Sequence, residues 1–409
     1  MKRTIYFQLS GMMFLEFFVW GAWYVTVGNY MNKIGMSEVI YWAYTVGPIG
    51  AILSPFFLGM VADRFFATER VLGTLHLIGG IAMILAPLAA EAGSAVWFIL
   101  LLLVHMICYM PTVGLANALA FHHMTDQEKY FPVVRVFGTI GWIIAGIFVS
   151  YVLGADETSV PLRVAGVAGL VMGFYSFTLP HTPPSKQEKA TFREVLGLDA
   201  LARLKSPSFI VFIVSSFLVC IALSTYYAYA PVFVNVSGIS SPAFKMSFGQ
   251  MSEVIFILLM PFFFRFMGIK WMLLVGMLAW VIRYAFFALA APAGILWMIM
   301  AGIVLHGLCY DFFFVAGQIY VDKISTREIR GQAQGFLVLM TYGAGMLIGA
   351  QVCGWLHNGI VTAAGTASLA QWQTFWMIPA IFAAVIMVFF AIFFKDSNRH
   401  PVEKAGQTA

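Results

Sequence analysis

The residues of this sequence that could do chemistry are ionisable side chains placed inside long apolar runs. Each would be costly against lipid, so each should face a partner, water or the interior of a helix bundle. Desolvation disfavours the charged form of a carboxylate in an apolar cavity, which lets such a group take up and release a proton. We therefore predict that a coupled proton is carried by Glu253, with Glu16 and then His306 as the next candidates. Arg283 and Asp311 are predicted to form a structural ion pair.

Helical spacing places several of these groups on the same face as aromatic or polar side chains. An aromatic residue at helical spacing is more often plain core, but such faces recur in both parts of the chain. Together they would suit a ligand with a flat ring and several hydroxyl groups. The predicted substrate-binding residues are Trp20, Arg135, Thr139, Trp142, Ser224, Tyr227, Gln250, Glu253 and Tyr310.

The elements that carry these residues are apolar segments long enough to cross a bilayer. Hydrophobic residues make up 61% of the 409 residues and charged residues only 10%, which predicts an all-α integral membrane protein. A bilayer core needs roughly 20 apolar residues per helix. On that basis we predict twelve transmembrane helices, at 4–30, 39–62, 70–90, 95–121, 131–153, 160–180, 207–235, 244–266, 268–292, 294–321, 332–358 and 371–394.

A long polar stretch, 181–206, separates the first six predicted segments from the last six. Ser54-Pro55-Phe56-Phe57 recurs as Met260-Pro261-Phe262-Phe263, about half the chain later, which indicates two related halves. The second part of the polar stretch, 192–204, has leucines at helical spacing and is predicted to form an amphipathic helix. The predicted organisation is a first half, a linker, a second half and a tail, at 1–180, 181–206, 207–394 and 395–409.

The distribution of basic residues predicts the orientation. If both termini are cytoplasmic, the outer side carries only Lys33, Arg163 and Lys245, and the other basic residues outside the helices face inwards. The net charge of +5 reflects this asymmetry and gives no reason to expect nucleic acid as a partner. The four cysteines lie in apolar segments and are predicted to be packing residues, and we expect no metal and no cofactor.

Other functional classes find little support. The sequence has no G-x-x-x-x-G-K-[ST] phosphate loop for ATP-driven transport and no H-E-x-x-H zinc motif or Ser/His/Asp arrangement for an intramembrane enzyme. A receptor would need a soluble output domain, and the predicted loops and tail are too short to supply one. The classes that remain are secondary transporters that rock around a central site.

A loop motif points to a known superfamily. Gly59-Met-Val-Ala-Asp63-Arg64, followed by Arg70, resembles the loop signature of the major facilitator superfamily. The two arginines are predicted to hold a cytoplasmic gate shut, while Asp63 accepts hydrogen bonds from a neighbouring helix end.

A narrower resemblance covers nearly the whole chain. It is carried by Trp20-Gly-Ala-Trp23, Tyr109-Met-Pro-Thr112, Arg135-Val-Phe-Gly-Thr139-Ile-Gly-Trp142, Leu196-Gly-Leu-Asp-Ala-Leu201, Gln250-Met-Ser-Glu253, Tyr310-Asp-Phe-Phe313 and Ala333-Gln-Gly335. With these stretches the chain resembles the nucleoside:proton symporter family. The resemblance implies proton-coupled import and a nucleoside site that includes Arg135, Thr139, Gln250 and Glu253.

The chain also departs from that family. Its well-studied members carry a glutamine and an asparagine where this chain has Ser224 and Tyr227, a phenylalanine at Trp142 and a glutamine at Glu16. Losing two amides removes donors and acceptors that would read the edge of a base. We therefore expect a proton-coupled nucleoside importer that functions as a monomer in a bacterial cytoplasmic membrane, with a sugar or glycoside transporter as the alternative.

Overall fold

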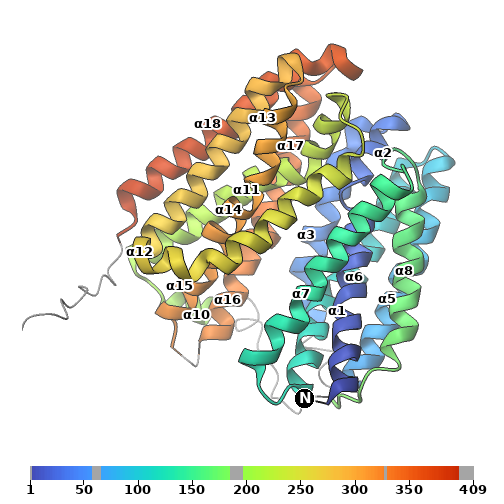
Figure 1. The fold of residues 1–409 in the computed structure, drawn as a ribbon, viewed down its shortest axis with the longest axis vertical. Helices are drawn as coiled ribbons and strands as arrows, with labels where there is room; N and C mark the ends of the chain where they lie inside the picture. The colour runs from blue at the N-terminus through green and yellow to red at the C-terminus, as the bar shows by residue number, and fades with distance from the viewer. Residues whose placement is uncertain (1, 58–65, 185–196, 327–328, 396–409) are drawn as a thin grey trace, which may run out of the picture.

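The computed structural model describes residues 2–57, 66–184, 197–326 and 329–395, and the secondary structure of these residues is helical throughout (Figure 1). The N-terminal part contains α1 (Arg3–Trp23), α2 (Val27–Lys33), α3 (Ile40–Phe57), α5 (Thr68–Glu91), α6 (Ala95–His123), α7 (Gln127–Gly146) and α8 (Val160–Ser176). The C-terminal part contains α10 (Leu198–Arg203), α11 (Pro207–Val236), α12 (Pro242–Ala290), α13 (Leu296–Val304), α14 (His306–Tyr310), α15 (Ala316–Ile324), α16 (Arg330–Val338), α17 (Met346–Ile360) and α18 (Leu369–Phe393).

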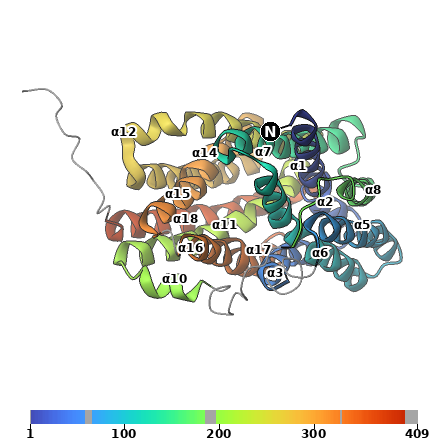
Figure 2. The same ribbon diagram turned by 90° about the horizontal axis from the view of Figure 1, so that it is seen from below.

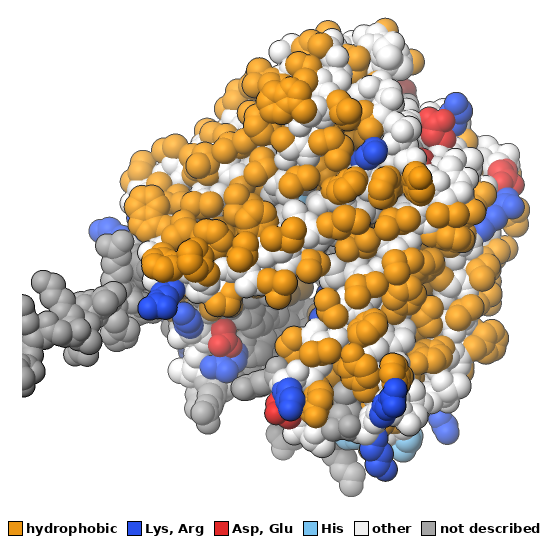
Figure 3. Space-filling view, viewed as in Figure 1, with side chains coloured by type: hydrophobic (Ala, Val, Ile, Leu, Met, Phe, Trp, Pro, Cys, Tyr) orange, Lys and Arg blue, Asp and Glu red, His pale blue; other side chains and the backbone are white. Residues whose placement is uncertain are grey.

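The described residues contain nine helical stretches that are long and apolar enough to cross a membrane, and α8 is a shorter apolar helix. The count differs from the predicted twelve for three reasons: one stretch contains two predicted segments, α8 is short, and the predicted segment 39–62 ends outside the described residues, which leaves α3 out of the nine. Thus α12 covers two predicted segments and turns sharply at Gly268. The backbone there has φ 68° and ψ 174°, a conformation that glycine adopts readily because it has no side chain. On the face shown in Figure 3, large apolar side chains cover the middle of the molecule and most charged ones lie towards its two ends.

The helices form two groups that lie side by side (Figures 1 and 2). We call them the N-terminal helices (Arg3–Ser176) and the C-terminal helices (Pro207–Phe393). In the first group α1 packs against α7 and α8, and α5 against α6 and α8. In the second group α12 packs against α13, α14 and α18, and α11 against α17 and α18. The small linker helix α10 packs against α16.

Three π-helical segments interrupt the long helices. They span Ile147–Val152 after α7, Asp311–Val315 after α14 and Leu339–Gly345 between α16 and α17. Such wide turns are frequent at functional sites because they re-aim the side chains around them. The predicted segments 294–321 and 332–358 are therefore each divided into pieces, and the two interruptions lie near the cavity described below.

The two helix groups are joined at the end of the molecule that carries α2 and the loop 153–159. We call this end the opposite face, and the end that carries the N-terminus and α10 the linker face (Figure 1). Four hydrogen bonds cross between the groups on the side of the opposite face: Ala243 N to Asp156 Oδ1 (2.9 Å), Asn235 Nδ2 to Glu157 Oε1 (2.7 Å), Gln351 Nε2 to Thr45 Oγ1 (2.8 Å) and Asn358 Nδ2 to Glu38 O (2.7 Å).

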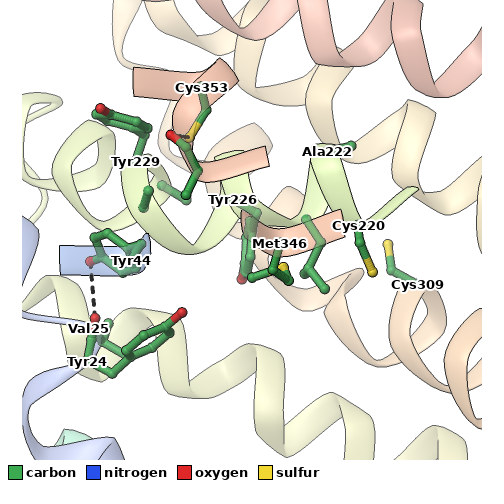
Figure 4. Close-up of a cluster of buried hydrophobic side chains, with 14 of the residues drawn as sticks. Tyr24, Val25, Tyr44, Cys220, Ala222, Tyr226, Tyr229, Cys309, Met346 and Cys353 are labelled. Carbon is green, nitrogen blue, oxygen red and sulfur yellow. Dashed lines mark hydrogen bonds between the residues drawn. The ribbon is translucent and has the colours of Figure 1, made fainter. Parts of the chain in front are cut away.

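A buried aromatic and sulfur-rich cluster continues this junction into the molecule (Figure 4). Tyr44 on α3 donates a hydrogen bond to the carbonyl of Tyr24 (3.1 Å), and both lie near the C-terminal residues Tyr226 and Tyr229. All four cysteines are buried and free.

Candidate functional site

A cavity of about 420 Å³ lies between the two groups of helices and takes its lining from both. The N-terminal helices contribute residues from α1, α3, α6 and α7, and the C-terminal helices contribute from α11, α12, α14, α16 and α17. Ser54 and Pro55, near the linker-face end of α3, belong to the lining, whereas the hydrogen bonds that join the two helix groups lie towards the opposite face. The volume suits a small molecule of the size of a ring with a few substituents.

One wall is the α7 face that carries Arg135, Thr139 and Trp142, all of which line the cavity. These residues share a face because they are spaced by one and two helical turns. Gly141 lets α7 lie directly against α1, since a Cβ there would sit 2.2 Å from the carbonyl oxygen of Phe14. The Arg135 guanidinium lies 4.1 Å from the centre of the Phe17 ring, a cation–π contact that holds it at the cavity.

The facing wall carries Gln250 and Glu253 on α12 and His306 on α14. Here α12 and α14 touch through Gly307, where a Cβ would come within 2.5 Å of the Glu253 nitrogen. This close approach brings His306 Nε2 to 4.0 Å from Glu253 Oε2. Both residues line the cavity, but the Glu253 side chain is 26% exposed and that of His306 only 2%, so the carboxylate is the more accessible of the two groups.

Aromatic side chains fill much of the remaining lining. Trp20 meets Trp142 edge to face with ring centres 5.5 Å apart, and Tyr24 meets Tyr227 across the two helix groups at 5.8 Å. The Tyr310 hydroxyl forms a short hydrogen bond with that of Tyr342. Ring faces, phenol hydroxyls, one guanidinium and one carboxylate are thus available to a ligand in a single space.

Nearly all predicted binding residues meet in this cavity, and Ser224 is the exception. Its hydroxyl is fully buried and donates to the carbonyl of Met346 (2.9 Å), where α11 packs closely on α17 at Gly349. Tyr227, predicted on the same face of the helix, does line the cavity. Ser224 therefore lies in a contact between helices.

The predicted ion pair between Arg283 and Asp311 is not formed. Arg283 Nε donates to the Gly302 carbonyl (3.0 Å), and its guanidinium lies 4.0 Å from the ring centre of Tyr226. Both carboxylate oxygens of Asp311 are buried without a hydrogen-bond partner among the described residues. The prediction was wrong because the spacing of residues along each helix does not show which way the guanidinium turns, and it turns to the Gly302 carbonyl and the Tyr226 ring.

Glu16, the second candidate for proton coupling, lies outside the lining. It is fully buried and is bonded to His76 on α5 (2.8 Å) and Thr112 on α6 (2.6 Å). Among the predicted gate residues, Asp63 and Arg64 lie outside the described residues, as does 192–196 of the predicted amphipathic helix. Arg70 is exposed on α5, near the linker face.

Sequence reasoning missed several lining residues, among them Phe17, Tyr24, Met110, Tyr342 and Met346. Tyr342 carried a usable signal, because a lone phenol stands beside the small residues of Gly343-Ala344-Gly345. Tyr24 carried none, since it follows the last residue of α1 and its direction depends on the turn before α2.

Comparison with known proteins identifies the family of the chain. Residues 2–399 match the family described as "Nucleoside H+ symporter". The chain belongs to the nucleoside H+ symporter family. The match spans nearly every described element, so both walls of the cavity lie within it.

Individual relatives of this symporter agree with the family match. The chain is 37% identical to the "Putative nucleoside transporter YegT" of Escherichia coli, over 97% of this chain and 95% of that protein. It is 31% identical to the xanthosine permease of Escherichia coli, over 98% of each chain. The crystal structure of the nucleoside transporter NupG superposes with a TM-score of 0.85 at 30% identity, covering 96% of this chain and 99% of that one. The symporter is therefore a multi-pass membrane transporter and not an enzyme.

Proposed function

We propose that this symporter imports nucleosides together with protons across a bacterial cytoplasmic membrane, alternating between two openings of the central cavity. The observation that carries the proposal is the meeting of Arg135, Trp142, Gln250 and Glu253 in one space between the two helix groups. A binding site shared by two groups that can rock against each other is what alternating access requires.

The side chains have distinct proposed roles in binding. Trp20 and Trp142 stack on the base, because aromatic planes bind flat rings without reading their edges. Arg135, Thr139 and Gln250 bind the polar edge of the base or the ribose hydroxyls, and the phenols of Tyr227 and Tyr310 supply further donors. Ser224 donates to the Met346 carbonyl, so it affects ligand binding only by fixing the position of α11.

Glu253 is the proposed carrier of the coupled proton. It is the carboxylate that the cavity exposes, and it has His306 at 4.0 Å, a second group able to hold a proton. Glu253 also lies beside Gln250, so a bound ligand and a bound proton would meet on one turn of α12. Glu16, with its partners already in place, is better suited to the role inferred in the next section.

The arrangement in the membrane follows from the distribution of charge. We propose twelve crossings in two halves, 1–180 and 207–394, joined by 181–206, with both termini and the linker face in the cytoplasm. The tail 395–409 would then also be cytoplasmic. In this orientation the structure represents a state closed to the outside, because the bonds that join the helix groups lie at the opposite face. A single chain supplies the whole site, so we propose a functional monomer surrounded by lipid.

Uptake of labelled uridine, adenosine, xylose and maltose into cells that express the full chain tests the proposal. Nucleoside accumulation that a protonophore abolishes is expected, and Glu253→Gln should abolish accumulation while leaving exchange of bound nucleoside. Glu91→Gln is the matched control, because Glu91 is 48% exposed and its partners, Arg163 and Ser159, are surface residues far from the cavity lining. Uptake of a sugar instead of a nucleoside would overturn the proposed substrate. Accumulation by the Glu253→Gln variant would overturn the proposed role of Glu253 as the proton carrier.

A further inference from the structure

The N-terminal helices contain a polar cluster that the transport cycle proposed above does not use. Glu16 on α1 is 0% exposed, and His76 on α5 is 3% exposed. Glu16 Oε2 lies 2.8 Å from His76 Nε2, and the Thr112 hydroxyl donates to Glu16 Oε1 at 2.6 Å. Both carboxylate oxygens are therefore occupied, each by a different helix, which fixes α1 relative to α5 and α6.

The cluster is also connected to Trp20, a residue that lines the cavity. The hydroxyl of Tyr109 on α6 donates to the backbone carbonyl of Glu16 (2.8 Å), and its ring meets that of Trp20 edge to face at 5.5 Å. Trp20 lies one helical turn beyond Glu16 on α1 and lines the cavity. Its indole nitrogen is buried and has no hydrogen-bond partner in the part of the chain that the structure describes, so no hydrogen bond from those residues fixes the ring.

The position of Trp20 thus depends on groups behind it. Toward the ligand it meets Trp142 and Tyr24 only through ring edges, which are contacts that tolerate sliding. Behind it, directional hydrogen bonds fix α1 to α6: Tyr109 donates to the backbone carbonyl of Glu16, and Thr112 donates to the Glu16 carboxylate. A buried carboxylate is costly unless its bonds are all made, so the cluster has one favourable arrangement and resists small displacements.

We infer that Glu16 is a positioning residue for the substrate, which acts through Trp20 by fixing where α1 presents the indole to the cavity. His76 and Thr112 are the groups that hold Glu16 in place. The inference rests on the proposed function in one respect, namely that Trp20 stacks on the transported ring. It assigns Glu16 a part in binding affinity although it touches neither the ligand nor the cavity.

The test is a double-mutant cycle on the purified full chain with labelled uridine. Trp20→Ala is expected to raise the Kd about tenfold, the size of a lost aromatic contact. Glu16→Ala should raise the Kd by a similar factor, with little change in the maximal uptake rate of cells that express the variant. The double variant should bind no more weakly than Trp20→Ala alone, because Glu16 acts through the indole. Glu16→Gln, which keeps an acceptor for Thr112, should bind within about threefold of the wild type.

Two controls separate positioning from a general loss of packing. Ser176→Ala removes a buried hydroxyl of α8 that bonds only within its own helix, to Met172 (2.7 Å), and should leave the Kd unchanged. The second control needs no nucleoside: a thiol introduced by Trp20→Cys should react with a maleimide at a rate that Glu16→Ala changes several-fold. The four native cysteines are buried and give a low background.

The outcomes distinguish the inference from the proposed function. If Glu16→Ala lowers only the thermal midpoint and leaves both the Kd and the maleimide rate unchanged, Glu16 is a packing residue and the inference is wrong. Multiplying effects in the double variant would also overturn it. If Trp20→Ala binds uridine as the wild type does, the proposed stacking role fails, and the maleimide rate alone then decides whether Glu16 positions α1.

Discussion

Removal of the Asp156 carboxylate should open the junction at the opposite face. Asp156 is 7% exposed in the loop 153–159, and its Oδ1 accepts the backbone N–H of Ala243 (2.9 Å) at the start of α12. Ser241, which precedes α12, makes no side-chain cap bond, so Asp156 caps this helix from the other helix group. Its Oδ2 accepts from Ser150 (2.7 Å), but that bond stays within one group and does not resist opening.

The size of the effect follows from the one hydrogen bond of Asp156 that crosses between the helix groups. A hydrogen bond contributes about 0.5–1.5 kcal/mol net, and the charge of the carboxylate adds nothing to this because burial disfavours its ionised form and raises its pKa. Asp156→Ala should therefore shift the equilibrium between closed and open junctions by roughly 2- to 12-fold towards the open state. Asp156→Asn keeps an acceptor for Ala243 and should remain closed.

Spin labels can measure this opening. Ala92 and Thr366 are exposed near the opposite face on different helix groups, so cysteine substitutions there report the distance between the groups. The distance distribution of Asp156→Ala should gain a longer component that Asp156→Asn lacks. If Asp156→Ala keeps the wild-type distribution, the reasoning about the crossing bond is refuted.

The remaining predictions concern pH, packing and the cavity. Burial raises the pKa of Asp156, so the closed junction binds the proton of this carboxyl more tightly than a hydrated open junction does. Closure should therefore weaken as the pH rises from about 3.9 through the raised pKa. Asp156→Asn should remove this pH dependence in the same spin-label assay. Gly141→Ala should destabilise the protein by about 1–3 kcal/mol in thermal unfolding, because its Cβ would meet Phe14 O at 2.2 Å, whereas Gly335→Ala meets nothing within 4 Å and should be neutral. Arg135→Lys keeps the charge but loses the planar fork, so uridine affinity should fall about tenfold; an unchanged Kd would remove Arg135 from the site.

The sequence could predict the cavity residues that depend on spacing along a single helix. Arg135, Thr139 and Trp142 meet in the cavity because one helix face presents them together, and Gln250 and Glu253 do so for the same reason. Their ionisable members were also marked by their cost in lipid. The all-helical membrane class followed in the same way, from the length and apolarity of the segments.

Contacts between residues on different helices could not be predicted from the spacing of residues along one helix. Glu16 shares a face with Trp20, yet its partner His76 lies on another helix, and nothing local to either residue indicates the bond. Ser224 and Tyr227 share a face too, but the close approach of α17 takes the serine away from the cavity. The role of Asp156 was missed because its partner is a backbone N–H, which every residue except proline carries.

The π-helical segment Leu339–Gly345 bears on how relatives of this symporter could diverge. Val338, Tyr342 and Met346 all line the cavity, and the wide turn between them keeps the three side chains on one side. A π turn amounts to one additional residue in an α-helix, so deletion of a single residue there would restore regular geometry. Because the wide turn takes up this residue locally, α17 beyond it would keep its orientation, and the side chains of the segment, Tyr342 among them, would be re-aimed. One codon gained or lost could thus change one wall of the cavity while the rest of the helix bundle stays in place.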